Sequence, residues 1–156
     1  MRIPVIEQTK IQAQVLVPLI EALQAELGEE RANALVRNAL GDHYRHLGEQ
    51  WRRSKGSSNL GETMASAFTA FAASEALDTQ VREQSQDTFA LDVTRCRYAE
   101  FYKELGVPEL GFLLVCTSDY PFAEGLGPGI QLSRTQTIMQ GATHCDFRYT
   151  REKEAG

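Results

Sequence analysis

The stretch TFALDVTR, residues 88–95, decides the fold class, because its side chains alternate between apolar and polar types. Phe89, Leu91 and Val93 fall on one face of this stretch, and Asp92 falls on the other. A period of two residues is typical of a strand with one buried face. The residues that precede it have a helical period instead, so the chain changes here from helices to strands.

Three helices are predicted upstream of this strand. Apolar side chains recur at helical spacing over residues 6–27, 29–53 and 61–73. Pro18 lies inside the first of these segments and predicts a kink or a break, because proline has no amide hydrogen to donate. Residues 55–60, KGSSNL, have the composition of a loop.

The remainder of the chain reads as a small sheet interrupted by helices. A strand over residues 77–83 would pair with residues 88–95 as a hairpin. The following pattern predicts, in order, a helix over 97–105, a helix or buried strand over 109–117, a helical turn or loop over 119–126, a sharp turn at 125–129, strands over 130–139 and 143–149, and a frayed tail at 151–156. Helices first and then an antiparallel sheet of about four strands, with helices inserted between strands, indicate an α+β fold.

The length of 156 residues fits a single domain, 1–156. Within it we expect a helical part over residues 1–75 and an α+β part over residues 76–150. The composition is 42% hydrophobic, which is enough for a core of ordinary size.

The charge and the apolar pattern exclude several classes of partner. A net charge of −5 does not favour nucleic acid. No run of about 18 apolar residues is present to cross a membrane, and MRIPVIEQTK at the start is not a secretory signal. The three cysteines are widely separated and odd in number, so we expect reduced thiols and a cytoplasmic location.

Cysteine and carboxylate side chains are the candidates for chemistry. Cys96 and Glu100 are four residues apart and share a face of the predicted helix, where they could relay a proton. They could equally be a buried thiol and a solvated carboxylate. Asp119 could cap the following helical turn, or it could be a general acid or base at the rim of a pocket.

The last predicted strand, HCDFRY at 144–149, carries the third thiol. Alternation places Cys145 on one face and His144, Asp146 and Arg148 on the other. A reactive thiolate needs a nearby base or cation, so a partner for Cys145 must come from another segment. Asp119, Glu100 and His43 are the possible partners, and a core thiol among aromatic residues is the alternative.

Spacing does not predict a metal site. The sequence has no CxxC, HxxxH or HExxH pattern. His43 and His46 are three residues apart and could share a metal, but a surface pair explains them as well. A site built from the three cysteines has no support from spacing. We therefore expect neither a metal nor a cofactor.

Two long segments resemble the L-2-amino-thiazoline-4-carboxylic acid hydrolase family. They are RCRYAEFYKELGVPELG, residues 95–111, and CTSDYPFAEGLGPGIQLSRTQTIMQGATHCDFRY, residues 116–149. Residues 10–28, KIQAQVLVPLIEALQAELG, are consistent with the family but less specific. The resemblance covers most of the chain.

This resemblance implies hydrolysis of a small cyclic amidine or isothiourea, such as L-2-amino-thiazoline-4-carboxylate, to N-carbamoyl-L-cysteine. The reaction needs a nucleophile, an acid–base group and a cation for the substrate carboxylate. We expect the catalytic residues to be Cys145, Asp119 and Glu100. The substrate-binding residues would be Cys96, Arg134, Arg148, Asp146 and His144. Water attack and covalent catalysis both remain open, as does Asp146 serving only to fix the end of its strand.

The competing hypothesis is a non-enzymatic small-molecule binding or sensor domain of a metabolic pathway, because a fold does not fix a function. In both cases the expected partner is a small molecule, and a homo-oligomer is possible.

Overall fold

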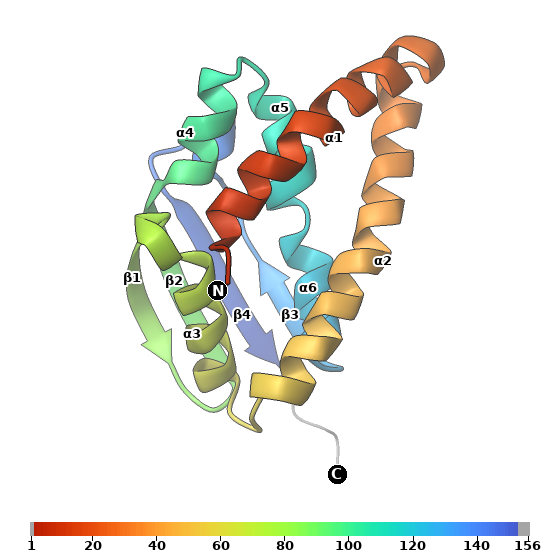
Figure 1. Ribbon diagram of the computed structural model, residues 1–156. Helices are drawn as coiled ribbons and strands as arrows, with labels where there is room; N and C mark the ends of the chain where they lie inside the picture. Colours follow the sequence, from red (N-terminus) through yellow and green to blue (C-terminus); the bar gives the residue numbers. More distant parts are fainter. Residues whose placement is uncertain (1, 153–156) are drawn as a thin grey trace.

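Two long helices form a hairpin at the start of the chain (Figure 1). In the computed structural model, which describes residues 2–152, α1 spans Val5–Leu27 and α2 spans Glu29–Lys55. Gly28 joins them with a φ of 86°, a value that side chains other than glycine rarely adopt. Helix α1 runs through Pro18 without interruption, so the break considered from the sequence does not occur.

Four antiparallel strands form one sheet in the order β1-β2-β4-β3. Their bounds are Leu77–Gln84 for β1, Thr88–Cys96 for β2, Ile130–Ser133 for β3 and Cys145–Arg151 for β4. The register places Leu91 opposite Phe147 and Val93 opposite Cys145. The alternation of β2 therefore matches that of β4, and both strands turn their apolar side chains to the same face.

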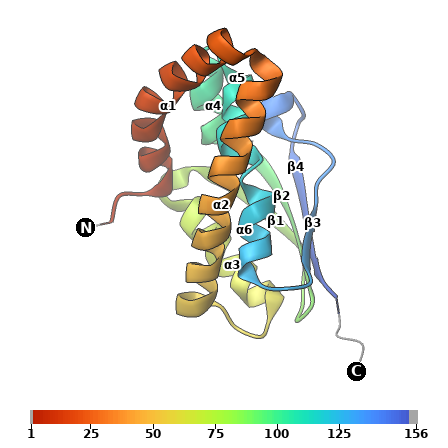
Figure 2. The same ribbon diagram turned by 90° about the vertical axis from the view of Figure 1, so that its right-hand side faces the viewer.

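The remaining helices lie with α1 and α2 on one side of this sheet, and Figure 2 shows its other side uncovered. Helix α3, Leu60–Phe71, precedes the sheet, followed by a short 3₁₀ turn, η1, Ala73–Glu75. Between β2 and β3 come α4, Arg97–Glu104; α5, Pro108–Gly111; a π-helical turn, η2, Phe112–Cys116; and α6, Asp119–Leu126. A second 3₁₀ turn, η3, Ile138–Gln140, separates β3 from β4. This α+β architecture was predicted from the sequence.

The predicted bounds of two strands need correction. The strand predicted over residues 130–139 ends at Ser133, because the chain leaves the sheet at Arg134. The last strand starts two residues later than predicted and includes Arg151, which donates to the carbonyl oxygen of Ser58. Residues 153–156 of the predicted tail lie outside the described residues. The ambiguous segments at 109–117 and 119–126 are both helical.

The core contains residues from both predicted parts of the chain. One cluster extends from Ile6 and Ile20 on α1 to Leu113 and Met139. The other lies under the sheet and includes the side chains Leu60, Met64, Phe68, Phe89, Leu91, Val93, Phe147 and Tyr149. Within residues 2–152, none of the helices combines the length and apolarity that crossing a bilayer requires.

Helices α2 and α6 approach so closely that their backbones touch. A Cβ atom added at Gly48 would lie 2.3 Å from the carbonyl oxygen of Phe122. One added at Gly125 would lie 2.0 Å from the carbonyl oxygen of Arg45. Only glycine fits at these two positions, because the obstructing atoms belong to the backbone and cannot rotate away.

We expect Gly48→Ala to lower the free energy of unfolding by about 1–3 kcal/mol, the usual cost of overpacking. Gly41→Ala on the same helix is the matched control, because no atom lies within 4 Å of its added Cβ. Replacing that glycine should raise stability by roughly 0.5–1 kcal/mol through helix propensity. Urea denaturation measures both, and equal effects of the two variants would contradict the close contact.

Candidate functional site

An ion pair between Asp119 and Arg134 lies between α6 and the sheet. The Nη1 atom of Arg134 donates to Oδ2 of Asp119 at 2.7 Å. The side chain of Arg134 is only 3% exposed, whereas that of Asp119 is 26% exposed. The guanidinium group is therefore sealed in the protein, and the carboxylate keeps a surface that a small molecule can reach.

Three elements hold the Arg134 guanidinium: η2, α6 and β4. Its Nη2 atom donates to the carbonyl oxygen of Cys116 at 3.1 Å, at the end of the π-helical turn η2. Its Cζ atom lies 5.3 Å from the ring centre of Tyr120 and 5.1 Å from that of Phe147. Both are cation–π contacts, which gain strength when the cation is shielded from water. Such π-helical turns are frequent at functional sites.

The Asp119 carboxyl group titrates near neutrality. Burial raises its pKa to about 6, and the charge and hydrogen bond of Arg134 oppose this rise only in part. Asp119 is not the N-cap of α6, because Ser118 occupies that position, and no side chain accepts a capping hydrogen bond there. The capping explanation of Asp119 is therefore wrong, and the group is free to exchange a proton near pH 6.

Three thiols surround this pair. Burial raises the pKa of Cys145, and the nearby charge of Asp119 adds to the rise while that of Arg134 opposes it. Burial also raises the pKa of Cys96 to about 11 and that of Cys116 well above its usual value, and Asp119 contributes to both. All three sulfur atoms are therefore protonated at neutral pH.

The sulfur atoms of two cysteines accept backbone hydrogen bonds. Cys96 is the N-cap of α4 and accepts from the amide of Ala99 at 3.4 Å. Cys145 accepts from the amide of Ile138 at 3.2 Å. The structure thus brings together Cys145, Asp119, Cys96 and Arg134 among the residues predicted from the sequence.

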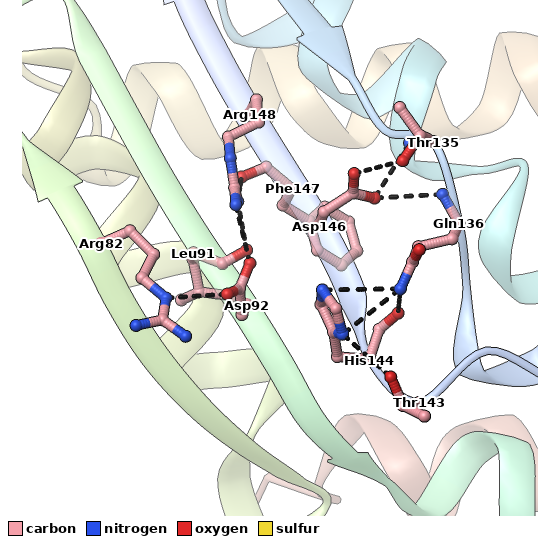
Figure 3. Close-up of polar contacts among 10 residues, drawn as sticks. All are labelled: Arg82, Leu91, Asp92, Thr135, Gln136, Thr143, His144, Asp146, Phe147 and Arg148. Atoms are coloured by element: carbon pink, nitrogen blue, oxygen red, sulfur yellow. Dashed lines mark hydrogen bonds and ion pairs between the residues drawn. The ribbon is translucent and has the colours of Figure 1, made fainter.

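Asp146 fixes the loop that carries Arg134 (Figure 3). Its carboxylate accepts from the amides of Thr135 and Gln136 at 2.9 and 3.0 Å and from the Thr135 hydroxyl. Burial raises the pKa of Asp146, but these hydrogen bonds outweigh it and the net pKa is lowered. Asp146 is thus a charged clamp that holds the backbone next to Arg134.

Arg148 of β4 and His144, the residue before this strand, have polar partners of their own (Figure 3). Arg148 donates through Nη2 to Asp92 at 2.9 Å, and Arg82 donates to the other oxygen of Asp92 at 2.7 Å. The side-chain amide of Gln136 donates to the carbonyl oxygen of His144 at 2.9 Å. Neither Arg148 nor His144 contacts the Asp119–Arg134 pair, so their predicted place beside Cys145 in one pocket is not observed.

Glu100 also lies away from the Asp119–Arg134 pair. Its carboxylate is 3.3 Å from the Nη2 atom of Arg95, and both side chains are about half exposed. It shares α4 with the Cys96 cap but points to solvent. The i,i+4 relation between Cys96 and Glu100 does not bring the two side chains into one site.

A cleft of about 580 Å³ opens between α2 and the start of α6, and Asp119 is not itself among its lining residues. Its lining includes Tyr44 of α2 and the immediate neighbours of Asp119, which are Ser118 and Tyr120. Tyr120 also contacts Arg134. The pKa of Tyr44 is raised by burial and also by the charge of Asp119. These two tyrosines connect the cleft to the ion pair.

Sequence reasoning did not find this cleft. Its walls come from polar positions of α2 that look like an ordinary solvated helix face. No local signal distinguishes them, since the cleft depends on where α6 packs.

The histidines of α2 and the three cysteines are the metal ligands that the sequence offers. Among residues 2–152, no group of three or more histidine, cysteine or acidic side chains is placed to hold a metal ion. His46 instead lies beside Gln50 and Glu49 on the surface of α2.

Comparison with known proteins gives one result. The sequence model of the family described as L-2-amino-thiazoline-4-carboxylic acid hydrolase matches residues 8–149. No curated protein matches the chain.

We expect Arg134→Gln to lower the free energy of unfolding by about 3 kcal/mol at pH 8, because it leaves the Asp119 carboxylate without its cation. The loss should shrink toward pH 5, where Asp119 becomes neutral in the folded variant. Arg45→Gln is the control, since Arg45 pairs with Glu124 and Asp42 at the surface and should cost less than about 1 kcal/mol. Denaturant titrations at several pH values measure this, and a pH-independent loss would contradict the role of the ion pair.

Proposed function

Because the chain belongs to the L-2-amino-thiazoline-4-carboxylic acid hydrolase family, we propose that it hydrolyses a small cyclic amidine or isothiourea. The model substrate is L-2-amino-thiazoline-4-carboxylate, and the product is N-carbamoyl-L-cysteine. The match over residues 8–149 supports the reaction class. The Asp119–Arg134 pair, whose neighbours Ser118 and Tyr120 line a cleft, supports the choice of catalytic group.

Asp119 is the general acid–base group of this proposal. An efficient proton-transfer group has a pKa near the working pH, so that it can both take and give a proton. Burial brings the pKa of Asp119 to about 6. Arg134 holds the carboxylate in one orientation through the 2.7 Å hydrogen bond to Oδ2, which leaves Oδ1 available for water or substrate.

Hydrolysis then proceeds in two steps. Water adds across the carbon–nitrogen double bond of the ring: its oxygen bonds to the amidine carbon, and a proton passes through Asp119 to the ring nitrogen. In the second step the new hydroxyl proton passes through Asp119 to the ring sulfur. The carbon–sulfur bond breaks, the carbonyl forms, and the sulfur leaves as the thiol of N-carbamoyl-L-cysteine.

This proposal uses water rather than Cys145 as the nucleophile. A thiol reacts through its thiolate, and burial keeps the pKa of Cys145 raised. Its sulfur also accepts the amide hydrogen of Ile138, and only 7% of the residue is exposed. In this proposal Cys145 and Cys96 are neutral, polarizable side chains near the Asp119–Arg134 pair.

We expect the wild-type protein to release thiol from the thiazoline acid and Asp119→Asn to lose at least about 100-fold in kcat, the usual share of general acid–base catalysis. A thiol reagent follows the rate, and mass spectrometry identifies N-carbamoyl-L-cysteine. Asp78→Asn, at an exposed position on β1, is the matched control and should keep the wild-type rate.

Two further variants separate the mechanisms. Cys145→Ser should retain activity within a few-fold if water attacks directly, and its complete inactivity would favour covalent catalysis. Glu100→Gln should retain activity, since Glu100 pairs with Arg95 outside the group. If the wild type binds the thiazoline acid without releasing thiol, the protein is a binding or sensor domain and the hydrolase proposal is wrong.

The pH profile gives an independent check on Asp119. As a base it must be ionised, so kcat/KM should rise with pH through about 6 and level off above it. Arg134→Lys should move this inflection upward, because a less well-paired carboxylate holds its proton more tightly. Steady-state rates between pH 4.5 and 8.5, at about 0.5-unit steps, measure both curves. An inflection that does not respond to Arg134→Lys would assign the titration to another group.

A further inference from the structure

We infer that Arg37 of α2 binds the carboxylate of the substrate, and that the cleft between α2 and α6 is where the substrate lies. This inference rests on the proposed function for the identity of the ligand. It adds a binding residue that neither the sequence motifs nor the family match indicates.

Arg37 lines two clefts of the protein. One is the cleft of about 580 Å³ between α2 and α6, and the other, of about 510 Å³, is bounded by Phe112 and Met139. Leu113 is the other side chain common to both. The two hollows therefore meet at Arg37 and Leu113, where an apolar wall faces a cation.

Arg37 has the charge that a carboxylate needs. Among residues 2–152 it forms no ion pair. Arg37 is exposed and lines the cleft, and none of the side-chain hydrogen bonds among residues 2–152 uses its N–H donors. Arginine matches a carboxylate with two parallel hydrogen bonds, which fix orientation as well as position.

Three other arginines that could bind a carboxylate already have acidic partners. Arg134 is bound to Asp119 and is 3% exposed. Arg148 is bound to Asp92 on the opposite face of the sheet. Arg45 also lines the cleft, but Asp42 and Glu124 hold it at 3.0 and 2.9 Å. These two carboxylates outweigh the single charge of Arg45, and Arg37 is the one other cation among the residues that line the larger cleft.

The same cleft borders the segment that carries the proposed acid–base group. Ser118 and Tyr120, which flank Asp119 in sequence, form the wall opposite α2. Tyr44, which like Arg37 belongs to α2, lines the cleft within reach of the Asp119 charge. A ligand anchored at Arg37 by its carboxylate would thus extend its ring along the tyrosines toward Asp119.

Removing either charged partner, the Arg37 guanidinium or the substrate carboxylate, tests the contact. The probes are the thiazoline acid and 2-amino-2-thiazoline, which has the same ring without the carboxylate. We expect Arg37→Gln to lower kcat/KM for the acid about 10- to 100-fold, mainly through KM, as the loss of a charge-assisted hydrogen bond does. The same substitution should leave kcat/KM for the decarboxylated ring unchanged. Arg31→Gln is the control, since it removes the same charge from an exposed position of α2 outside both clefts.

The outcomes separate this inference from the proposed reaction. If the wild type is active and Arg37→Gln affects both compounds equally, or neither, the anchor is wrong and the hydrolase proposal stands. If the wild type is inactive, calorimetric titration with the thiazoline acid decides. Binding by the wild type and by Arg31→Gln but not by Arg37→Gln supports the anchor without the reaction. Equal binding by all three, or binding by none, overturns the anchor.

Discussion

Burial of one cation, the guanidinium of Arg134, sets the arrangement of the C-terminal half. A buried charge costs several kcal/mol unless it is paired and hydrogen-bonded. Arg134 meets this condition only where Asp119 of α6, the Cys116 carbonyl of η2 and the Phe147 ring of β4 come together. The chain must therefore leave the sheet after Ser133, and Asp146 accepts the amide hydrogens that the loop no longer offers to a neighbouring strand.

Two aspartates of this protein have pKa values shifted in opposite directions. Asp92 is held by Arg82 and Arg148, and their hydrogen bonds outweigh the effect of burial, so its pKa is lowered. Asp119 is held by Arg134 alone, burial dominates, and its pKa rises to about 6. The first is a permanently charged link across the outer face of the sheet. The second changes charge near neutrality, as a proton-transfer group must.

The sequence predicts the elements whose causes are local. Alternation over residues 88–95 identifies β2, and helical spacing identifies α1 to α3 within a few residues of their bounds. It fails at residues 134–139, whose β-branched composition favours a strand, because the side chain of Arg134 finds its partner on α6. Sequence resemblance indicated Asp119 and Arg134 separately. Their pairing depends on long-range packing. The side chain of Glu100 lies outside the site and pairs with Arg95 instead.

The cleft has the same long-range origin, because it follows from how α2 and α6 cross. They touch where Arg45 and Gly48 of α2 meet Phe122 and Gly125 of α6, and Arg45 also pairs there with Glu124. Glycine at both positions lets the backbones touch at this end. Farther up α2 the helices diverge, and nothing lies within 4 Å of a Cβ placed at Gly41. Tyr44 and Arg37 line the space that opens there. A close glycine contact at one end of a helix pair thus leaves room for a ligand at the other, near the segment that carries Asp119.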